Sequence, residues 1–64
     1  MGTLRELRLQ RARALIEQSS RLNVGALSWR CGFADPSGFS KLFRARFGLA
    51  PTEWHQQARA ATRR

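Results

Sequence analysis

The chain has 64 residues, with 12 Lys and Arg against 4 Asp and Glu, and its formal net charge is +8. A chain this short forms at most one small domain, and its single cysteine, Cys31, excludes an internal disulfide. With one cysteine and one histidine, it also has no metal-ligand cluster of recognisable spacing, so we expect no metal and no cofactor. The strong positive charge makes nucleic acid the leading candidate partner.

Membrane association is a less favoured interpretation of the same charge. No apolar run approaches the roughly 20 residues of a bilayer span, and no apolar signal region follows the basic start. The basic residues are also spread over every segment of the chain. We therefore expect a cytoplasmic protein without a membrane partner.

The first predicted helix covers residues 3–20. Thr3 and Glu6 have the spacing of a capping box, which places the helix start at Thr3. The serines at 19 and 20 are poor helix formers and mark its end. Its apolar residues form a narrow stripe near the start and a broader one from Leu9 onward; they are Leu4, Leu7, Leu9, Ala12, Leu15 and Ile16.

Residues 23–47 predict two short helices joined by a tight turn. Asn23 is the expected cap of the first helix, and Asp35 followed by Pro36 has the pattern of a cap and first-turn proline for the second. Gly32, between them, can adopt the positive φ that such a turn requires. Each helix has one apolar or small stripe, at Val24, Leu27, Ser28 and Cys31 and then at Phe39, Leu42, Phe43 and Phe47. This arrangement is typical of a helix-turn-helix.

A last helix is predicted over residues 51–61. Gly48 stops the preceding helix and Pro51 opens the new one, with Ala50 as a poor cap. Trp54, Ala58 and Ala61 share one face, which is expected to cover the core. The sequence thus predicts an all-α fold over residues 1–64, a small helical bundle containing a homeodomain-like helix-turn-helix.

The same residues carry a specific resemblance. RLQRARALI, followed by VGALSWRCGFADPSGFSKLFRARFGLAP, resembles the C-terminal half of the DNA-binding domain of AraC/XylS-type bacterial transcription regulators. The positions that fit include Gly32, Phe33 and Asp35, and the run from Phe39 to Arg44. Departures are Ser28 for the usual Ala, Ala50 for the usual Ser or Thr, and Trp54-His55 for the aromatic-Arg ending.

The resemblance implies a partial DNA-binding domain, with residues 3–20 as the linker helix and 23–47 as the second of two helix-turn-helix units. The first unit and an upstream effector domain would then be absent from this chain. In that case Leu4 and Leu7 would face the absent unit and be partly exposed here.

The candidate DNA-contacting residues lie opposite the aromatic stripe of the helix 36–47. We predict base contacts from Ser37, Gly38 and Lys41. The predicted phosphate contacts are Arg30, Ser40, Arg44 and Arg46. For Lys41 a phosphate-bound or solvated lysine is an equally open alternative. Trp29 lies outside the stripe of its helix, so it either packs on a neighbouring element or meets the DNA backbone.

The function predicted is sequence-specific DNA binding in transcription regulation, with the helix 36–47 in the major groove of double-stranded DNA. The alternative is a truncated regulator fragment with little DNA affinity that acts through protein contacts, for example with RNA polymerase. No enzyme is expected, because His55 has no Ser, Cys or carboxylate in any recognised catalytic arrangement.

Overall fold

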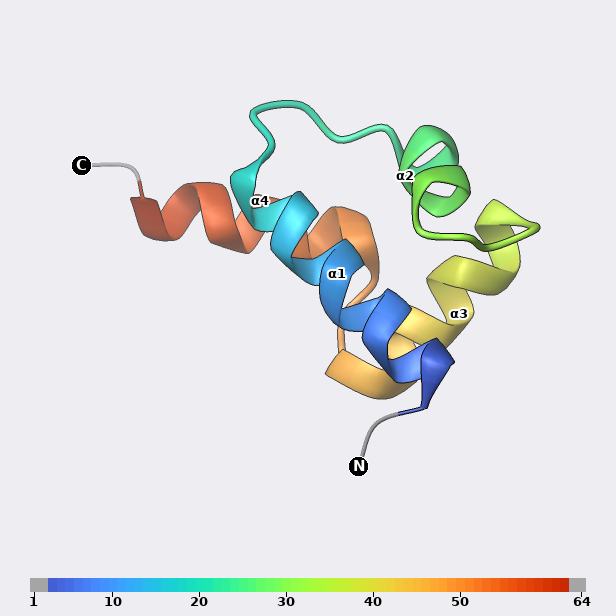
Figure 1. The fold of residues 1–64 in the computed structure, drawn as a ribbon. Coiled ribbons are helices and arrows are strands. Elements are labelled where there is room, and N and C mark those ends of the chain that lie inside the picture. Colours follow the sequence, from blue (N-terminus) through green and yellow to red (C-terminus); the bar gives the residue numbers. More distant parts are fainter. Residues whose placement is uncertain (1–2, 63–64) are drawn as a thin grey trace.

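The computed structural model describes residues 3–62, and these form four helices and no strand. The helices are α1 (Leu4–Gln18), α2 (Val24–Arg30), α3 (Pro36–Phe47) and α4 (Pro51–Thr62). Figure 1 shows α2 and α3 at one end of α1, while α4 lies beside the other end. The predicted all-α fold with a helix-turn-helix is confirmed.

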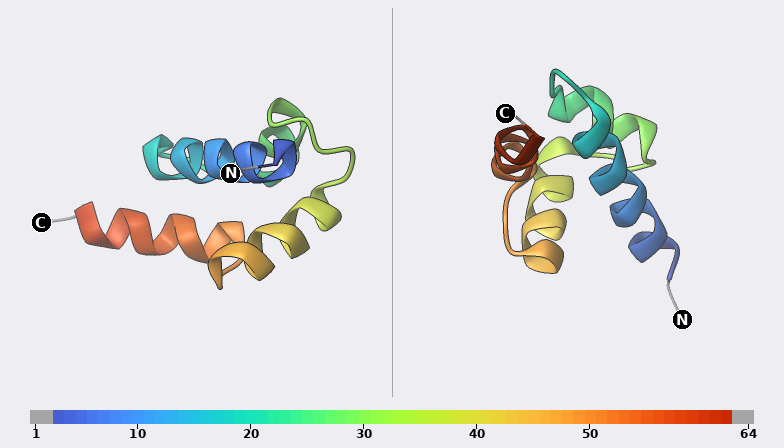
Figure 2. Two further views of the ribbon diagram at one scale, coloured as in Figure 1. Left: turned by 60° about the horizontal axis from the view of Figure 1, so that its bottom comes forward. Right: turned by 90° about the vertical axis from the view of Figure 1, so that its left-hand side faces the viewer.

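α1 lies across the rest of the molecule and joins its two halves. In the left view of Figure 2, α3 and α4 follow one another along one side of α1. α1 and α4 run side by side in the same direction, and α4 continues past the end of α1. No described helix has the length and apolar character needed to cross a membrane.

Side-chain caps fix the starts of the first three helices. The Thr3 hydroxyl accepts a hydrogen bond from the Glu6 amide at 3.1 Å. Asn23 accepts from Ala26 N at 3.0 Å, and Asp35 accepts from Gly38 N at 3.0 Å. The predicted caps are therefore correct, although the capping box at Thr3 is only half formed, because the carboxylate of Glu6 bonds elsewhere.

The α3–α4 junction follows the predicted stop and start. Gly48 ends α3 with φ 87°, a left-handed conformation that glycine adopts without a Cβ penalty. Ala50 has no side chain that can cap α4, and its backbone amide instead donates to Glu53 Oε1 at 2.9 Å. This bond is one of the two that make up a capping box; the other is missing because Ala50 has no side-chain oxygen.

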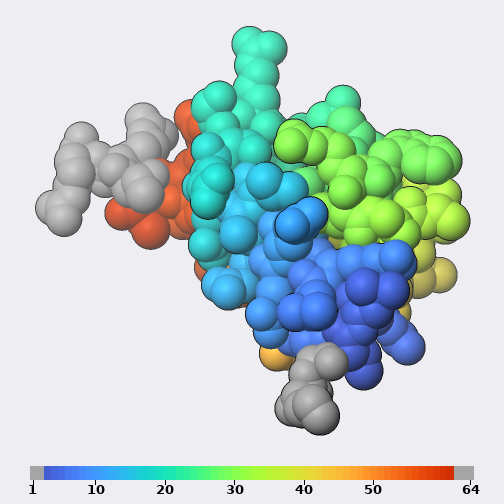
Figure 3. Space-filling model, viewed as in Figure 1, coloured from blue at the N-terminus to red at the C-terminus, as the bar shows by residue number. Residues whose placement is uncertain are grey.

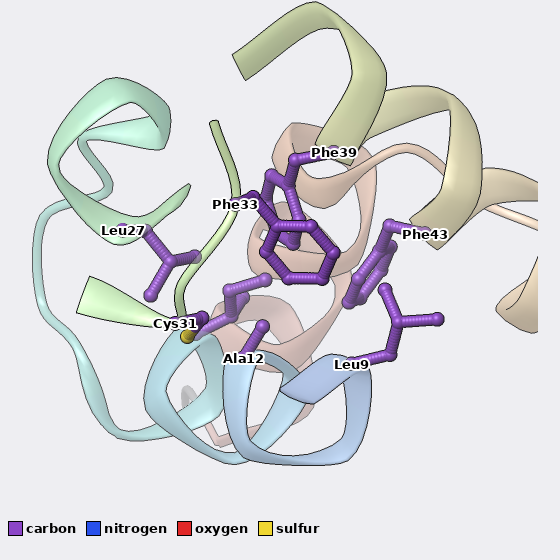
Figure 4. Packing of buried hydrophobic residues seen from close by; sticks show 8 residues of the cluster. Leu9, Ala12, Leu27, Cys31, Phe33, Phe39 and Phe43 are labelled. Carbon is purple, nitrogen blue, oxygen red and sulfur yellow. The ribbon is translucent and has the colours of Figure 1, made fainter. Parts of the chain in front are cut away.

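The core lies where α1 crosses α2 and α3 (Figure 4). Phe39 and Phe43 are fully buried at its centre, and their rings are 5.8 Å apart. The ring of Phe43 also meets that of Trp54 edge-on at 5.9 Å, which ties α4 to the same cluster. The remaining buried apolar residues are Leu9, Ala12, Ile16, Leu27, Cys31 and Phe33.

The apolar pattern differs at several positions from a simple buried stripe. Leu4 and Leu7 are 63% and 60% exposed, as predicted. Ala61 is exposed, so the prediction that α4 covers the core as far as Ala61 is wrong; α4 extends beyond the end of α1 there. Ser28 is fully buried, and its hydroxyl donates to Gly25 O at 2.8 Å, which satisfies the polar group inside the core.

Candidate nucleic-acid interface

The outer face of α3 is polar and open to solvent. Ser37, Lys41 and Arg44 are exposed, and they follow one another at the spacing of a single helix face. Gly38 and Ser40 flank them and are half-buried. Ser37, Gly38, Lys41 and Arg44 thus lie on the side of α3 opposite Phe39 and Phe43, and Ser40 lies at the margin of that face.

The turn before α3 sets how this face is presented. Gly32 has φ 84°, and Arg8 of α1 lies directly against it. A Cβ at this glycine would stand 3.0 Å from Arg8 Nε, while Arg8 NH1 donates to Gly32 O at 3.3 Å. The glycine thus permits both the backbone conformation and the close approach of α1 to the turn.

All four carboxylates of the chain are committed to contacts within it. Glu6 and Glu17 bond to side chains of other residues, and Asp35 and Glu53 accept from backbone amides at helix starts. None of them faces Lys41, Arg44 or Arg30 as an ion-pair partner in the part of the chain that the structure describes. No described carboxylate therefore compensates the charge of these three cations.

Arg46 is the exception among the predicted phosphate contacts. Its guanidinium forms an ion pair with Glu6 of α1, with an NH2 to Oε2 distance of 2.8 Å. Hydrogen bonds from Arg46, and then from Gln10, hold the pKa of Glu6 below its usual value, so the carboxylate stays charged at neutral pH. The pair contributes stability above the unfolded pKa of Glu6, and this contribution is lost as the pH falls through the lowered folded value.

Arg30 and Trp29 lie at the end of α2, away from the core. Arg30 lines a groove of about 540 Å³ between α1 and α2, together with two arginines of α1 and the exposed leucines at 4 and 7. Figure 3 views the molecule from the side on which the start of α1, in blue, lies beside the green end of α2. Trp29 is 69% exposed, so packing into a neighbouring element is not the role of its ring.

Sequence patterns did not reveal the polar contacts between α4 and the end of α1. His55 Nε2 lies 3.0 Å from the carbonyl oxygen of Ser19, and Arg59 donates to the carbonyl oxygen of Ser20. The departure of Trp54-His55 from the family pattern thus provides a side chain for the end of α1, where helix carbonyls lack partners. The only signal in the sequence was that no cation occupies the last turn of α1 itself.

No group of three His, Cys, Asp or Glu side chains within residues 3–62 has the placement of a metal site. Burial raises the pKa of the Cys31 thiol, so this side chain is protonated at neutral pH and acts as a small apolar core residue. The exposed polar face of α3 remains the candidate binding surface.

Comparison with known families agrees with this geometry. The family described as a helix-turn-helix domain matches residues 1–57 of the chain. The chain belongs to this family, in its AraC/XylS type. It is thus a helix-turn-helix domain of the DNA-binding kind found in bacterial transcription regulators.

Individual relatives of this helix-turn-helix domain are transcription regulators. The HTH-type transcriptional activator RhaR of Klebsiella pneumoniae is 40% identical over 58 residues, which are 91% of this chain and 20% of that protein. CdhR, an HTH-type transcriptional regulator of Pseudomonas aeruginosa, is 47% identical over 47 residues, or 73% of this chain and 14% of its own.

The HTH-type transcriptional activator RhaS of Escherichia fergusonii is 45% identical over 53 residues, or 83% of this chain and 19% of that protein. The chain thus spans a fifth or less of the length of these three relatives. No solved structure gave a significant match to the chain.

Proposed function

We propose that this helix-turn-helix domain reads a specific DNA sequence by placing α3 in the major groove. The observation that carries the proposal is the outer face of α3, on which exposed polar residues lie opposite two fully buried phenylalanines. A helix of this kind is the element that enters the groove in helix-turn-helix proteins. The family membership of the chain supports DNA as the partner.

Lys41 is the central residue of the proposed base-reading surface. It lies one turn into α3, is exposed, and forms no ion pair within the described structure. A lysine there can donate to the O6 and N7 acceptors of guanine, and Ser37 can bond either a base or a phosphate. Gly38 lacks a side chain, so we propose that it allows α3 to come close to the base edges.

Phosphate contacts position such a helix and supply most of its affinity. We assign them to Arg44 and Ser40 on the margin of the α3 face, and to Arg30 at the end of α2.

Selection from a randomised duplex pool, followed by titration of the selected and scrambled duplexes at two salt concentrations, tests this function. We expect the selected duplex to bind more tightly at both salt concentrations. Lys41→Ala should reduce that preference by about 1 to 3 kcal/mol if it contacts a guanine. Arg44→Ala is the matched control and should weaken binding to both duplexes equally. Equal, steeply salt-dependent binding of both duplexes by the unmodified chain would contradict sequence reading.

The exposed leucines favour a second function, in which the chain acts through protein contacts. Leu4 and Leu7 are more than half exposed and line the groove between α1 and α2. Exposed apolar surface of this kind is typical of protein interaction sites. Under this alternative the selection yields no preferred duplex, while substitution of Leu7 by Ser abolishes binding to a protein partner such as RNA polymerase.

A further inference from the structure

An ion pair joins the start of α1 to the last turn of α3. Arg46 Nε donates to both carboxylate oxygens of Glu6, at 2.8 and 2.9 Å, and Arg46 NH2 lies 2.8 Å from Oε2. The two residues are 40 positions apart in the sequence. Such charge-assisted, multiply bonded geometry fixes both side chains more firmly than a single contact does.

Each partner of this pair is also held from another side. Gln10 Nε2 donates to Glu6 Oε2 at 2.8 Å, so the carboxylate is oriented by its own helix. The Arg46 guanidinium lies over the ring of Phe47, 5.0 Å from its centroid. The Glu6 side chain is 21% exposed, which limits the competition of water for its oxygens.

The three cations of α3 differ in what they can offer a nucleic acid. Lys41 and Arg44 lie on the outer face and have no carboxylate partner within residues 3–62, whereas Arg46 is paired with Glu6. Five residues separate Lys41 from Arg46, which places them about 140° apart around the helix axis. Arg46 therefore lies on the side of α3 that faces α1.

We propose that Glu6 is a positioning residue for DNA recognition, which withholds Arg46 from DNA phosphates and fixes the end of α3 against α1. The inference rests on the proposed function, since it concerns how α3 meets DNA. The Arg46 side chain is 48% exposed, but the carboxylate beside it compensates part of its charge, so Arg46 contributes less to phosphate neutralisation than an unpaired arginine would. Base contacts from the outer face then account for a larger share of the binding free energy.

A purely structural ion pair would have a different effect. Breaking it would change the free energy of unfolding and leave the salt dependence of DNA binding as it was. If Glu6 withholds a cation from the phosphates, breaking the pair should instead change the salt dependence of DNA binding. Each phosphate contact contributes about 0.9 to the slope of log K against log salt. The salt slope on a mixed-sequence duplex therefore separates the two interpretations.

The principal test compares Glu6→Gln with Glu17→Gln in the full chain. Both substitutions remove one carboxylate charge from α1, and Glu17 also pairs with an arginine, Arg13. We expect Glu6→Gln to steepen the slope by up to about 0.9, which is a three- to four-fold greater loss of affinity between about 50 and 200 mM salt. Glu17→Gln should steepen the slope less, because Glu17 holds Arg13 by a single longer contact of 3.5 Å.

Three further variants extend the test, and the two without a change at Glu6 keep it informative if Glu6→Gln fails to fold. Arg46→Gln should leave the slope unchanged, because the charge that it removes was already paired. Arg44→Gln should reduce the slope by about 0.9. The double variant Glu6→Gln with Arg46→Gln should return the slope to that of the unmodified chain.

Equal slopes for Glu6→Gln and Glu17→Gln, or equal losses for Arg46→Gln and Arg44→Gln, would overturn the role of Glu6. These results leave the proposed function intact, because they do not involve the preference between duplexes. If the unmodified chain shows no preference for the selected duplex while the salt slopes are as expected, only the proposed sequence-specific binding is wrong. If no variant binds any duplex, both proposals are wrong.

Discussion

The helix-turn-helix and the α1–α4 pair are held together by different interactions. Apolar side chains and a glycine turn join α2 to α3, and Phe33 stacks on Phe39 with their ring centroids 4.9 Å apart. Between α1 and α4, polar side chains also cross the interface: Trp54 Nε1 donates to Glu17 at 3.0 Å, and His55 lies against Ser19 O. Polar side chains of α4 thus contribute to its packing on α1, whereas Ser37, Lys41 and Arg44 on the outer face of α3 are exposed to solvent.

Phe43→Ala should have the largest effect, because its ring belongs to both regions. The side chain is fully buried and contacts the rings of Phe39, Phe47 and Trp54. Removal of a buried phenylalanine costs about 3 to 5 kcal/mol, which is close to the whole stability expected of a domain this small. Circular dichroism at 25 °C should show a largely unfolded chain.

Leu7→Ala provides the control for the loss of an apolar side chain. Leu7 is 60% exposed, so its thermal unfolding midpoint should stay near that of the unmodified chain, in keeping with about 0.5 kcal/mol or less for surface changes. A folded Phe43→Ala variant with a similar midpoint would show that the two regions do not share one core.

Gly32→Ala should have an intermediate effect that is confined to the helix-turn-helix. Alanine at φ 84° costs about 1 to 2 kcal/mol, and its Cβ, 3.0 Å from Arg8 Nε, would also require the Arg8 side chain to shift. Gly48→Ala is the matched control, because Gly48 has φ 87° with nothing within 4 Å of the added Cβ. Chemical denaturation should show a greater loss of stability for Gly32→Ala.

The contact of Arg8 with the turn can be isolated in a double-mutant cycle. In an Arg8→Ala background, Gly32→Ala and Gly48→Ala should cost the same, because the side chain against the turn is gone. If the excess cost of Gly32→Ala persists in that background, the contact of α1 with the turn is not its cause.

Local signals in the sequence were sufficient to predict the helices and most of the core. Helix caps and turn glycines act on residues close to them in the sequence, so the sequence alone reveals them. These residues are Thr3, Asn23, Asp35, Gly32 and Gly48. The aromatic stripe of α3 likewise follows from helical spacing. The exposed face of α3 then follows as its complement.

Long-range polar contacts were not predictable in this way. The spacing of Thr3 and Glu6 is that of a capping box, and it does not reveal whether the Glu6 carboxylate bonds the backbone of Thr3. In the structure it bonds Arg46 instead. The sequence alone therefore predicts a phosphate contact for Arg46 and does not reveal Glu6 as an intramolecular competitor. The exposure of Ala61 was missed for a similar reason, because the helical pattern of α4 does not reveal where α1 ends beside it.

His55→Ala should have the smallest effect, and it tests whether polar contacts support the α1–α4 pair. The substitution removes the partner of Ser19 O, and we expect a loss of about 0.5 to 1.5 kcal/mol. Gln56→Ala is the matched control, since Gln56 is the exposed next residue of the same helix and both changes raise helix propensity. Thermal unfolding of both variants measures the difference.

His55→Ala should leave the DNA preference and the salt slope as they are, because α4 offers its polar groups to α1 and not to the face of α3. His55→Gln should recover part of the stability, since the glutamine amide can donate to the same carbonyl. If His55→Ala is no less stable than Gln56→Ala, the contact of His55 with Ser19 O does not stabilise the α1–α4 pair. The helix-turn-helix and the α1–α4 pair would then differ less than proposed in the interactions that hold them together.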